Sequence, residues 1–183
     1  LCIGFNRRFS PPMIQLREMV KSGRLGKILH IEGNVSGSGG LRYKAGHWRA
    51  NETESPAGGM TAMGVHMADA MIAILGPVKS LRATSERRVL KTGVDDTTFA
   101  DLKFKSGPTG VLTTLFATPQ FWRVQVFGDQ GWAEVRDYTR LEFRPIDGKP
   151  EVIEYPKFDM EAAELEAFAD ALTKRAPYPV TLA

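Results

Sequence analysis

The feature that most constrains this chain is a succession of short segments, each typical of a β-strand, that fills its second half. They are separated by turns rich in glycine, proline or aspartate. The segments are Val78–Leu90, Thr97–Phe104, Gly110–Ala117, Trp122–Phe127, Trp132–Arg136, Leu141–Pro145 and Glu151–Tyr155. Because consecutive strands joined by short turns pair in opposite directions, these segments predict one large, predominantly antiparallel sheet.

Helical patterns flank this block of strands. The predicted helices run from Pro11 to the glycines at 23 and 26, over Gly59–Leu75 and over Phe158–Lys174, and further strands are predicted over Leu1–Phe5 and Lys27–Ser38. Ser10 is expected to cap the first helix, and Gly76-Pro77 to end the second. Strands and helices in separate blocks indicate a single α+β domain over residues 1–183, with the helices packed on one face of the sheet.

Charge and cysteine content narrow the class of protein. The 24 basic and 21 acidic residues leave a net charge of +3 without a long basic run, so nucleic acid is not an expected partner. No apolar run approaches the ~18 residues that span a membrane, so no membrane partner is expected either. Cys2, predicted to lie in a buried strand, is the only cysteine. It fits a reducing, cytoplasmic location and excludes a cysteine-based zinc cluster; we expect no metal.

The Pro56–Asp69 stretch carries the main candidate for chemistry. Gly58-Gly59 permits a tight turn into the predicted helix. His66 and Asp69 then lie three residues apart on one side of that helix, so Asp69 is expected to accept a hydrogen bond from the imidazole and fix its tautomer. The alternative is that His66 is a satisfied core histidine among the methionines of the same helix.

A long segment of irregular pattern, Gly37–Ala57, precedes this helix. Loops of this length in a compact domain are usually functional or disordered. The segment holds Arg42, Tyr43, His47, Trp48 and Arg49, side chains suited to a polar, hydroxylated ligand. For Trp48, anchoring of the loop in the core is an equally good interpretation.

The helices cover one face of the predicted sheet and leave the other without cover. The apolar residues expected near that open face are Phe99, Leu102, Phe104, Leu112 and Leu115. We therefore expect a homodimer or homotetramer formed through this face. The alternative is a polar, solvated face, which is common in antiparallel sheets.

No single motif identifies the chemistry, because the glycine fingerprint of dinucleotide-binding folds is missing. Several short motifs occur in a fixed order, namely Gly4-Phe5-Asn6-Arg7-Arg8-Phe9, Gly23-Arg24-Leu25-Gly26-Lys27, Trp48-Arg49, Gly58-Gly59, Gly64-Val65-His66-Met67-Ala68-Asp69 and Asp95-Asp96-Thr97. In this order and spacing the chain resembles the second domain of the Gfo/Idh/MocA oxidoreductases, the family of glucose–fructose oxidoreductase and the inositol dehydrogenases. The implied fold is similar to the C-terminal domains of dihydrodipicolinate reductase and GAPDH.

The resemblance implies what lies outside the chain. It places an NAD(P)-binding Rossmann domain, with a lysine from a Glu-Lys-Pro motif, before Leu1, and a last helix after Pro177–Thr181. The first residue is not Met, which agrees with a truncated chain. Alone, this piece is expected to be inactive and unable to bind NAD or NADP.

The resemblance also assigns roles. His66, with Asp69, is the implied catalytic residue, although Ala62 stands where many members have an Asp one helical turn earlier. Arg7, Arg42, Tyr43, His47 and Arg49 are expected to hold the substrate, and Asn6 and Arg8 to contact the cofactor. The implied activity is hydride transfer between nicotinamide and a sugar, cyclitol or related polyol. The alternative is a non-catalytic ligand-binding or oligomerisation module of the same fold.

Overall fold

The computed structural model describes residues 2–180, so Leu1 and Thr181 of the predictions above lie outside the described residues. Eight strands form one sheet in the order β2-β3-β4-β1-β5-β6-β7-β8. Their bounds are β1 Ile28–Ser36, β2 Val78–Glu86, β3 Thr97–Phe104, β4 Thr109–Leu115, β5 Phe121–Gly128, β6 Gly131–Arg136, β7 Arg140–Pro145 and β8 Glu151–Glu154. Only β1 and β4 pair in parallel, and every other pairing is antiparallel. The predicted α+β fold class is confirmed.

Strand β2 ends at Glu86, four residues before the predicted end. The backbone N–H groups of Arg88, Val89 and Leu90 donate to the Asp96 carboxylate at 2.7–3.1 Å and are therefore lost to the sheet. Burial alone would raise the pKa of Asp96, but these donors and the Thr97 hydroxyl lower it below its usual value. The Asp95-Asp96-Thr97 motif thus anchors the loop between β2 and β3.

The predicted strand over Leu1–Phe5 is wrong. Residues 2–5 are irregular and lead into a short 3-10 helix, η1 (Asn6–Phe9), and Cys2 is half-buried rather than part of a buried strand. Within the described part of the chain, the segment pairs with no strand of the sheet. Its backbone binds side chains near the C-terminus instead, since Phe5 N–H donates to Glu164 at 2.5 Å and the Tyr178 hydroxyl donates to the carbonyl of Ile3.

The predicted helices are confirmed within a few residues. They are α1 (Pro11–Lys21), α3 (Val65–Leu75), preceded by a π-helical turn called η3 (Met60–Gly64), and α4 (Met160–Leu172). The Asp159 carboxylate caps α4 by accepting a hydrogen bond from Ala162 N–H at 2.9 Å. The expectation for Ser10 is wrong, because its buried hydroxyl oxygen makes no hydrogen bond to any residue that the structure describes. Pro12, at the second helical position, offers no N–H to cap.

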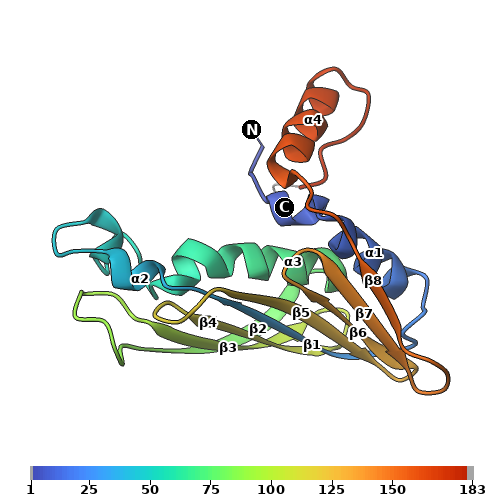
Figure 1. The fold of residues 1–183 in the computed structure, drawn as a ribbon, viewed down its shortest axis with the longest axis horizontal. Coiled ribbons are helices and arrows are strands. Elements are labelled where there is room, and N and C mark those ends of the chain that lie inside the picture. The colour runs from blue at the N-terminus through green and yellow to red at the C-terminus, as the bar shows by residue number, and fades with distance from the viewer. Residues whose placement is uncertain (1, 181–183) are drawn as a thin grey trace.

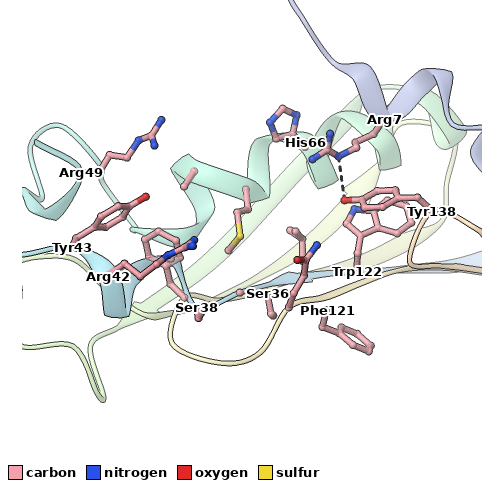
Figure 2. Close-up of a pocket in the computed structure, with 17 residues that line it drawn as sticks. Arg7, Ser36, Ser38, Arg42, Tyr43, Arg49, His66, Phe121, Trp122 and Tyr138 are labelled. Carbon is pink, nitrogen blue, oxygen red and sulfur yellow. Dashed lines mark hydrogen bonds between the residues drawn. The ribbon is translucent and has the colours of Figure 1, made fainter. Parts of the chain in front are cut away.

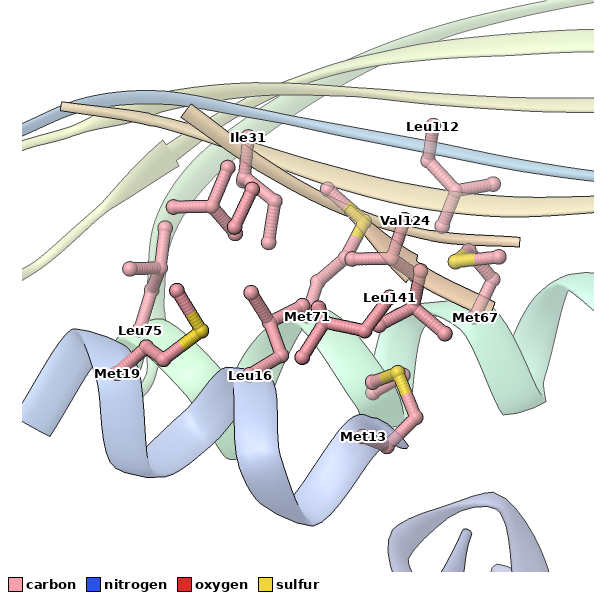
Figure 3. Close-up of a cluster of buried hydrophobic side chains, with 14 of the residues drawn as sticks. Met13, Leu16, Met19, Ile31, Met67, Met71, Leu75, Leu112, Val124 and Leu141 are labelled. Carbon is pink, nitrogen blue, oxygen red and sulfur yellow. The ribbon is translucent and has the colours of Figure 1, made fainter. Parts of the chain in front are cut away.

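Helices α1 and α3 cover one face of the sheet, and the core lies between the layers (Figure 1, Figure 3). Its largest contributors are Met13, Leu16 and Met19 from α1, Met67, Met71 and Leu75 from α3, and Ile31, Leu112, Val124 and Leu141 from the sheet. Gly33, in the middle of β1, lets α3 approach closely, because a Cβ there would overlap the Met67 and Met71 side chains.

Helix α4 does not cover the sheet, so the expectation of helices packed on one face holds for α1 and α3 only. It contacts η1, stands apart from the sheet in Figure 1, and buries none of its own residues. Leu165 and Leu172, on its predicted apolar face, are 67% and 68% exposed. No helix of residues 2–180 is long and apolar enough to cross a membrane.

The opposite face of the sheet is open, but fewer apolar side chains reach it than predicted. Phe99 is exposed and Leu115 half-buried, as expected for that face. Phe104 and Leu112 are buried in the core and Leu102 packs against it, because alternate residues of a strand point to opposite faces. The open face also carries ion pairs, such as Arg123 with Glu32 at 2.6 Å.

Candidate active site

A cavity of about 400 Å³ lies at the N-terminal end of α3, above the edge where β1 ends and β5 begins (Figure 2). Its lining comes from η1, the segment after β1, η3 with the start of α3, and the hairpin between β6 and β7. The cavity brings together five of the predicted residues: Arg7, Arg42, Tyr43, Arg49 and His66. Residues far apart in the sequence therefore meet at one site, as expected of a binding pocket.

The local backbone fixes where His66 points. Gly58 has φ +44°, and a Cβ there would collide with the Asp95 carbonyl oxygen, so the predicted tight turn is confirmed and requires glycine. The π-helical turn η3 follows at once, a feature often found at functional sites. Ala62 and Met63 of this turn line the cavity with His66, whose ring meets that of Phe5 edge to face at 5.9 Å.

The surroundings of His66 favour its neutral form. Burial lowers the pKa of the imidazole below 6.5, and the nearby positive charge of Arg7 lowers it further. Asp69 and Glu164 oppose the shift but do not reverse it. Nδ1 is buried and has no hydrogen-bond partner among residues 2–180, so His66 is not a satisfied core histidine there. A neutral imidazole at a cavity wall is able to accept a proton.

The expected hydrogen bond from His66 to Asp69 is not formed. Asp69, 7% exposed, instead pairs with Arg8, whose Nε and Nη2 donate to its two carboxylate oxygens at 2.9 and 2.6 Å. A guanidinium fork matches both oxygens of a carboxylate, which a single ring N–H does not. Asp69 therefore ties α3 to η1 and acts on His66 only through its charge.

The opposite wall of the cavity consists of residues that were not predicted from the sequence. Tyr138 packs against Trp122, with ring centroids 4.3 Å apart and ring planes tilted by 37°, and its hydroxyl accepts a hydrogen bond from Arg7 Nε at 3.1 Å (Figure 2). Tyr138 lies in the β6–β7 hairpin at φ +61°, a conformation that is uncommon for a bulky residue. The only signal in the sequence was the short gap between two predicted strands, which contains no glycine or proline.

The loop before α3 lies along the other side of the cavity. Tyr43 stacks on His47 at 4.7 Å, and the Arg49 guanidinium lies 4.6 Å from the centre of the Trp48 ring. His47 is not among the lining residues and supports Tyr43 from behind. Trp48 is 56% exposed, so the interpretation that it anchors the loop in the core is wrong.

Comparison with known proteins agrees with this architecture. A family model described as the GFO/IDH/MocA C-terminal domain matches residues 13–134. The chain belongs to the Gfo/Idh/MocA family. Among curated proteins, it is 25% identical over 130 residues to trans-1,2-dihydrobenzene-1,2-diol dehydrogenase of Mus musculus, which is 70% of this chain and 37% of that protein. The dehydrogenase aclE of Aspergillus oryzae is 28% identical over 95 residues, 52% of this chain and 26% of that protein.

Solved structures show the same fold over a larger share of the chain. A Desulfitobacterium hafniense protein assigned as an NADPH-dependent oxidoreductase superposes with a TM-score of 0.90 at 22% identity, covering 99% of this chain and 57% of that one. Levoglucosan dehydrogenase, in complex with NADH and levoglucosan, gives 0.81 at 15% identity, covering 93% and 56%. The chain thus spans little more than half of these proteins and less than half of the curated relatives.

Two further site predictions concern the cofactor. Asn6 Nδ2 donates to Glu161 at 2.5 Å, and Arg8 is paired with Asp69 and donates to the Pro179 carbonyl at 3.0 Å. Both side chains lie outside the lining of the cavity and hold η1 against its neighbours. In this Gfo/Idh/MocA domain, the Asn6 and Arg8 side chains therefore already form hydrogen bonds to other residues of the chain.

Proposed function

We propose that this chain is the substrate-binding domain of an NAD(P)-dependent dehydrogenase that oxidises a hydroxyl group of a sugar, cyclitol or related polyol. The observation that carries the proposal is His66, which is held neutral at the wall of a cavity rich in polar side chains. The oxidoreductase relatives, among them a complex of levoglucosan dehydrogenase with NADH, support it.

In this proposal His66 takes the proton of the reacting hydroxyl. Arg7 has two effects, since its charge keeps the imidazole neutral before the reaction and favours the oxyanion that develops as the proton leaves. Arg42, Tyr43 and Arg49 hold the rest of the substrate, with His47 supporting the Tyr43 ring. Asp69 positions this group through Arg8 and η1 rather than by contact with His66.

A bound NAD or NADP would supply the hydride acceptor for the carbon that carries the reacting hydroxyl. Residues 2–180 contain no glycine-rich turn between a strand and a helix that would cradle a pyrophosphate. We therefore propose that a preceding Rossmann domain holds the cofactor, with Asn6 and Arg8 beside it. This chain alone should show no saturable micromolar binding of either cofactor in a calorimetric titration.

A screen of the full-length protein tests the proposed function. Sugars, cyclitols and their derivatives are offered with NAD and with NADP, and nicotinamide reduction is followed by absorbance. We expect turnover of at least one hydroxylated compound, and we expect replacement of His66 to abolish that turnover. Absence of turnover across the panel, from a folded protein that binds the cofactor, would contradict it.

A non-catalytic ligand-binding or oligomerisation module is the second candidate, and Ala62 is the observation that favours it. Ala62 lines the cavity one turn before His66, so no carboxylate from that position reaches the imidazole. The coding sequence upstream discriminates between the two. A Gly-x-Gly-x-x-Gly turn followed by Glu-Lys-Pro favours the enzyme, whereas loss of that lysine favours the module.

We also propose that the protein associates into a homodimer or homotetramer through the open face of the sheet. Phe99 of β3 is 41% exposed on that face, and ion pairs lie on β1, β5, β6 and β7 of the same face. A mixed surface of this kind is typical of interfaces between folded protomers.

A further inference from the structure

The cavity around His66 is more positively charged than a site for a neutral polyol requires. Its lining includes Arg7, Arg42 and Arg49, and neither an aspartate nor a glutamate. Neutral sugars are commonly held by mixed donors and acceptors, because each hydroxyl both donates and accepts. Guanidinium groups only donate, so a lining of this composition favours a ligand that is rich in acceptors.

None of the three cavity arginines forms a salt bridge within residues 2–180. Arg7 donates to the Tyr138 hydroxyl and to the Asn6 amide oxygen, and Arg49 lies over the Trp48 ring, so all their partners are neutral. Most arginines outside the cavity do pair with acidic groups, namely Arg8, Arg24, Arg88, Arg123, Arg136, Arg140, Arg144 and Arg175, whereas Arg17, Arg82 and Arg87 do not. The cavity therefore gathers three arginines that have no counter-charge among residues 2–180.

A further donor at the same site has no partner among residues 2–180. Trp122 is 1% exposed and lines the cavity, and its indole Nε1–H is buried without a hydrogen bond to any of these residues. The indole nitrogen only donates, and a buried unsatisfied donor is costly. An acceptor oxygen of a bound ligand would satisfy it.

The arrangement in Figure 2 separates two ends of the cavity. His66 and Arg7 lie at one end near Tyr138, whereas Arg42 and Arg49 lie at the other, near Tyr43. A ligand that spans the cavity can present a hydroxyl to His66 and an anionic group to the distant arginines. Bidentate contacts to carboxylate or phosphate oxygens are the strongest hydrogen bonds that arginine makes.

We propose that the substrate is an anionic polyol, a sugar or cyclitol that carries a carboxylate or phosphate group, and that Arg42 and Arg49 bind that group. This inference rests on the proposed function for the position of the reacting hydroxyl. The charge preference itself is a binding property of the cavity and is measured without turnover.

Calorimetric titration of the full-length protein with matched ligands tests the preference. Each set comprises a neutral hexose, its uronate and its 6-phosphate, which share a ring and differ in charge. At least one anionic member should bind about tenfold or more tightly than its neutral parent, with affinity that falls as salt is added. A carboxylate is the group if the uronates show the preference, and a phosphate if the 6-phosphates do.

Variants that remove a positive charge then identify which residues bind the anionic group. Arg42→Gln and Arg49→Gln should each weaken binding of the preferred anion about tenfold and weaken binding of the neutral parent far less. Arg82→Gln is the matched control, because Arg82 is exposed on β2 and forms no salt bridge within residues 2–180. The control should keep the parent's preference.

The outcomes separate the two proposals. Absence of any anion preference, including absence of binding by every probe, overturns the anionic substrate. The proposal is also overturned if the anion preference survives both cavity variants while their melting temperature or NAD(P) affinity falls. That result would mean that Arg42 and Arg49 pair with another domain rather than with the ligand. Anion binding without any nicotinamide reduction instead supports the charge preference and counts against the dehydrogenase.

Discussion

We expect a large loss of stability when the negative charge of Asp69 is removed from the Arg8–Asp69 ion pair. Asp69→Asn keeps the size of the side chain but leaves a guanidinium without its counter-ion, in a site where Asp69 is 7% and Arg8 16% exposed. Breaking a buried pair costs about 3–5 kcal/mol, and the partial exposure of Arg8 favours a value of about 3. For a domain of this size, that corresponds to a fall in melting temperature of roughly 6–12 °C.

Thermal unfolding of the full-length protein measures this loss, and Arg8→Gln should reproduce it. Glu86→Gln is the control, because Glu86 and Arg88 form an exposed pair at 3.2 Å, and its loss should cost under about 1 kcal/mol. The reasoning fails if Asp69→Asn unfolds at the parent's temperature while kcat falls about a hundredfold. That result would restore Asp69 as a direct partner of His66 in proton transfer.

Three further outcomes follow from the structure. Because burial and Arg7 lower the pKa of His66 below 6.5, the decline of kcat/KM on acidification should have its midpoint below pH 6.5, and Arg7→Gln should move that midpoint to higher pH. A midpoint above pH 6.5 in the parent contradicts the assignment. Gly58→Ala should lower the free energy of unfolding, measured in urea, by about 2 kcal/mol or more, whereas Gly23→Ala should lower it by only about 1 kcal/mol, because Gly23 has φ +76° but open space around it. Equal losses would mean that the contact with Asp95 does not matter. Sedimentation at micromolar concentration should show a dimer or tetramer. Phe99→Lys should weaken this association, whereas Val89→Lys, in an exposed loop, should not. A monomer at all concentrations measured contradicts the interface.

The fold was largely predictable because its strands alternate and are separated by recognisable turns. β3 begins and ends where predicted, and β6 and β7 differ by one residue at one end. The failures have local causes. β2 was predicted too long because the backbone N–H groups after Glu86 donate to the Asp96 carboxylate instead of to a neighbouring strand. The pattern of hydrophobic residues does not show such a contact. The N-terminal run was predicted as a strand because apolar composition does not show whether a neighbouring strand exists.

The site was predictable in part, from the motifs and the polar loop. Arg7, Arg42, Tyr43 and Arg49 do meet His66 at one cavity. The partner of Asp69 was not predictable from i, i+3 spacing, because Arg8 reaches it from another element 61 residues away in the chain. Tyr138 and Trp122 were missed for the same reason, since their contacts are long-range.

The most direct test of the central claim is the turnover of His66→Asn in the full-length enzyme. Asparagine keeps a polar side chain of similar size but cannot act as the base, so kcat should fall by about 10²–10⁴-fold, the usual contribution of general-base catalysis. Cofactor affinity and melting temperature should match the parent. A folded His66→Asn enzyme that turns over within about threefold of the parent would contradict the assignment of His66 as the proton acceptor.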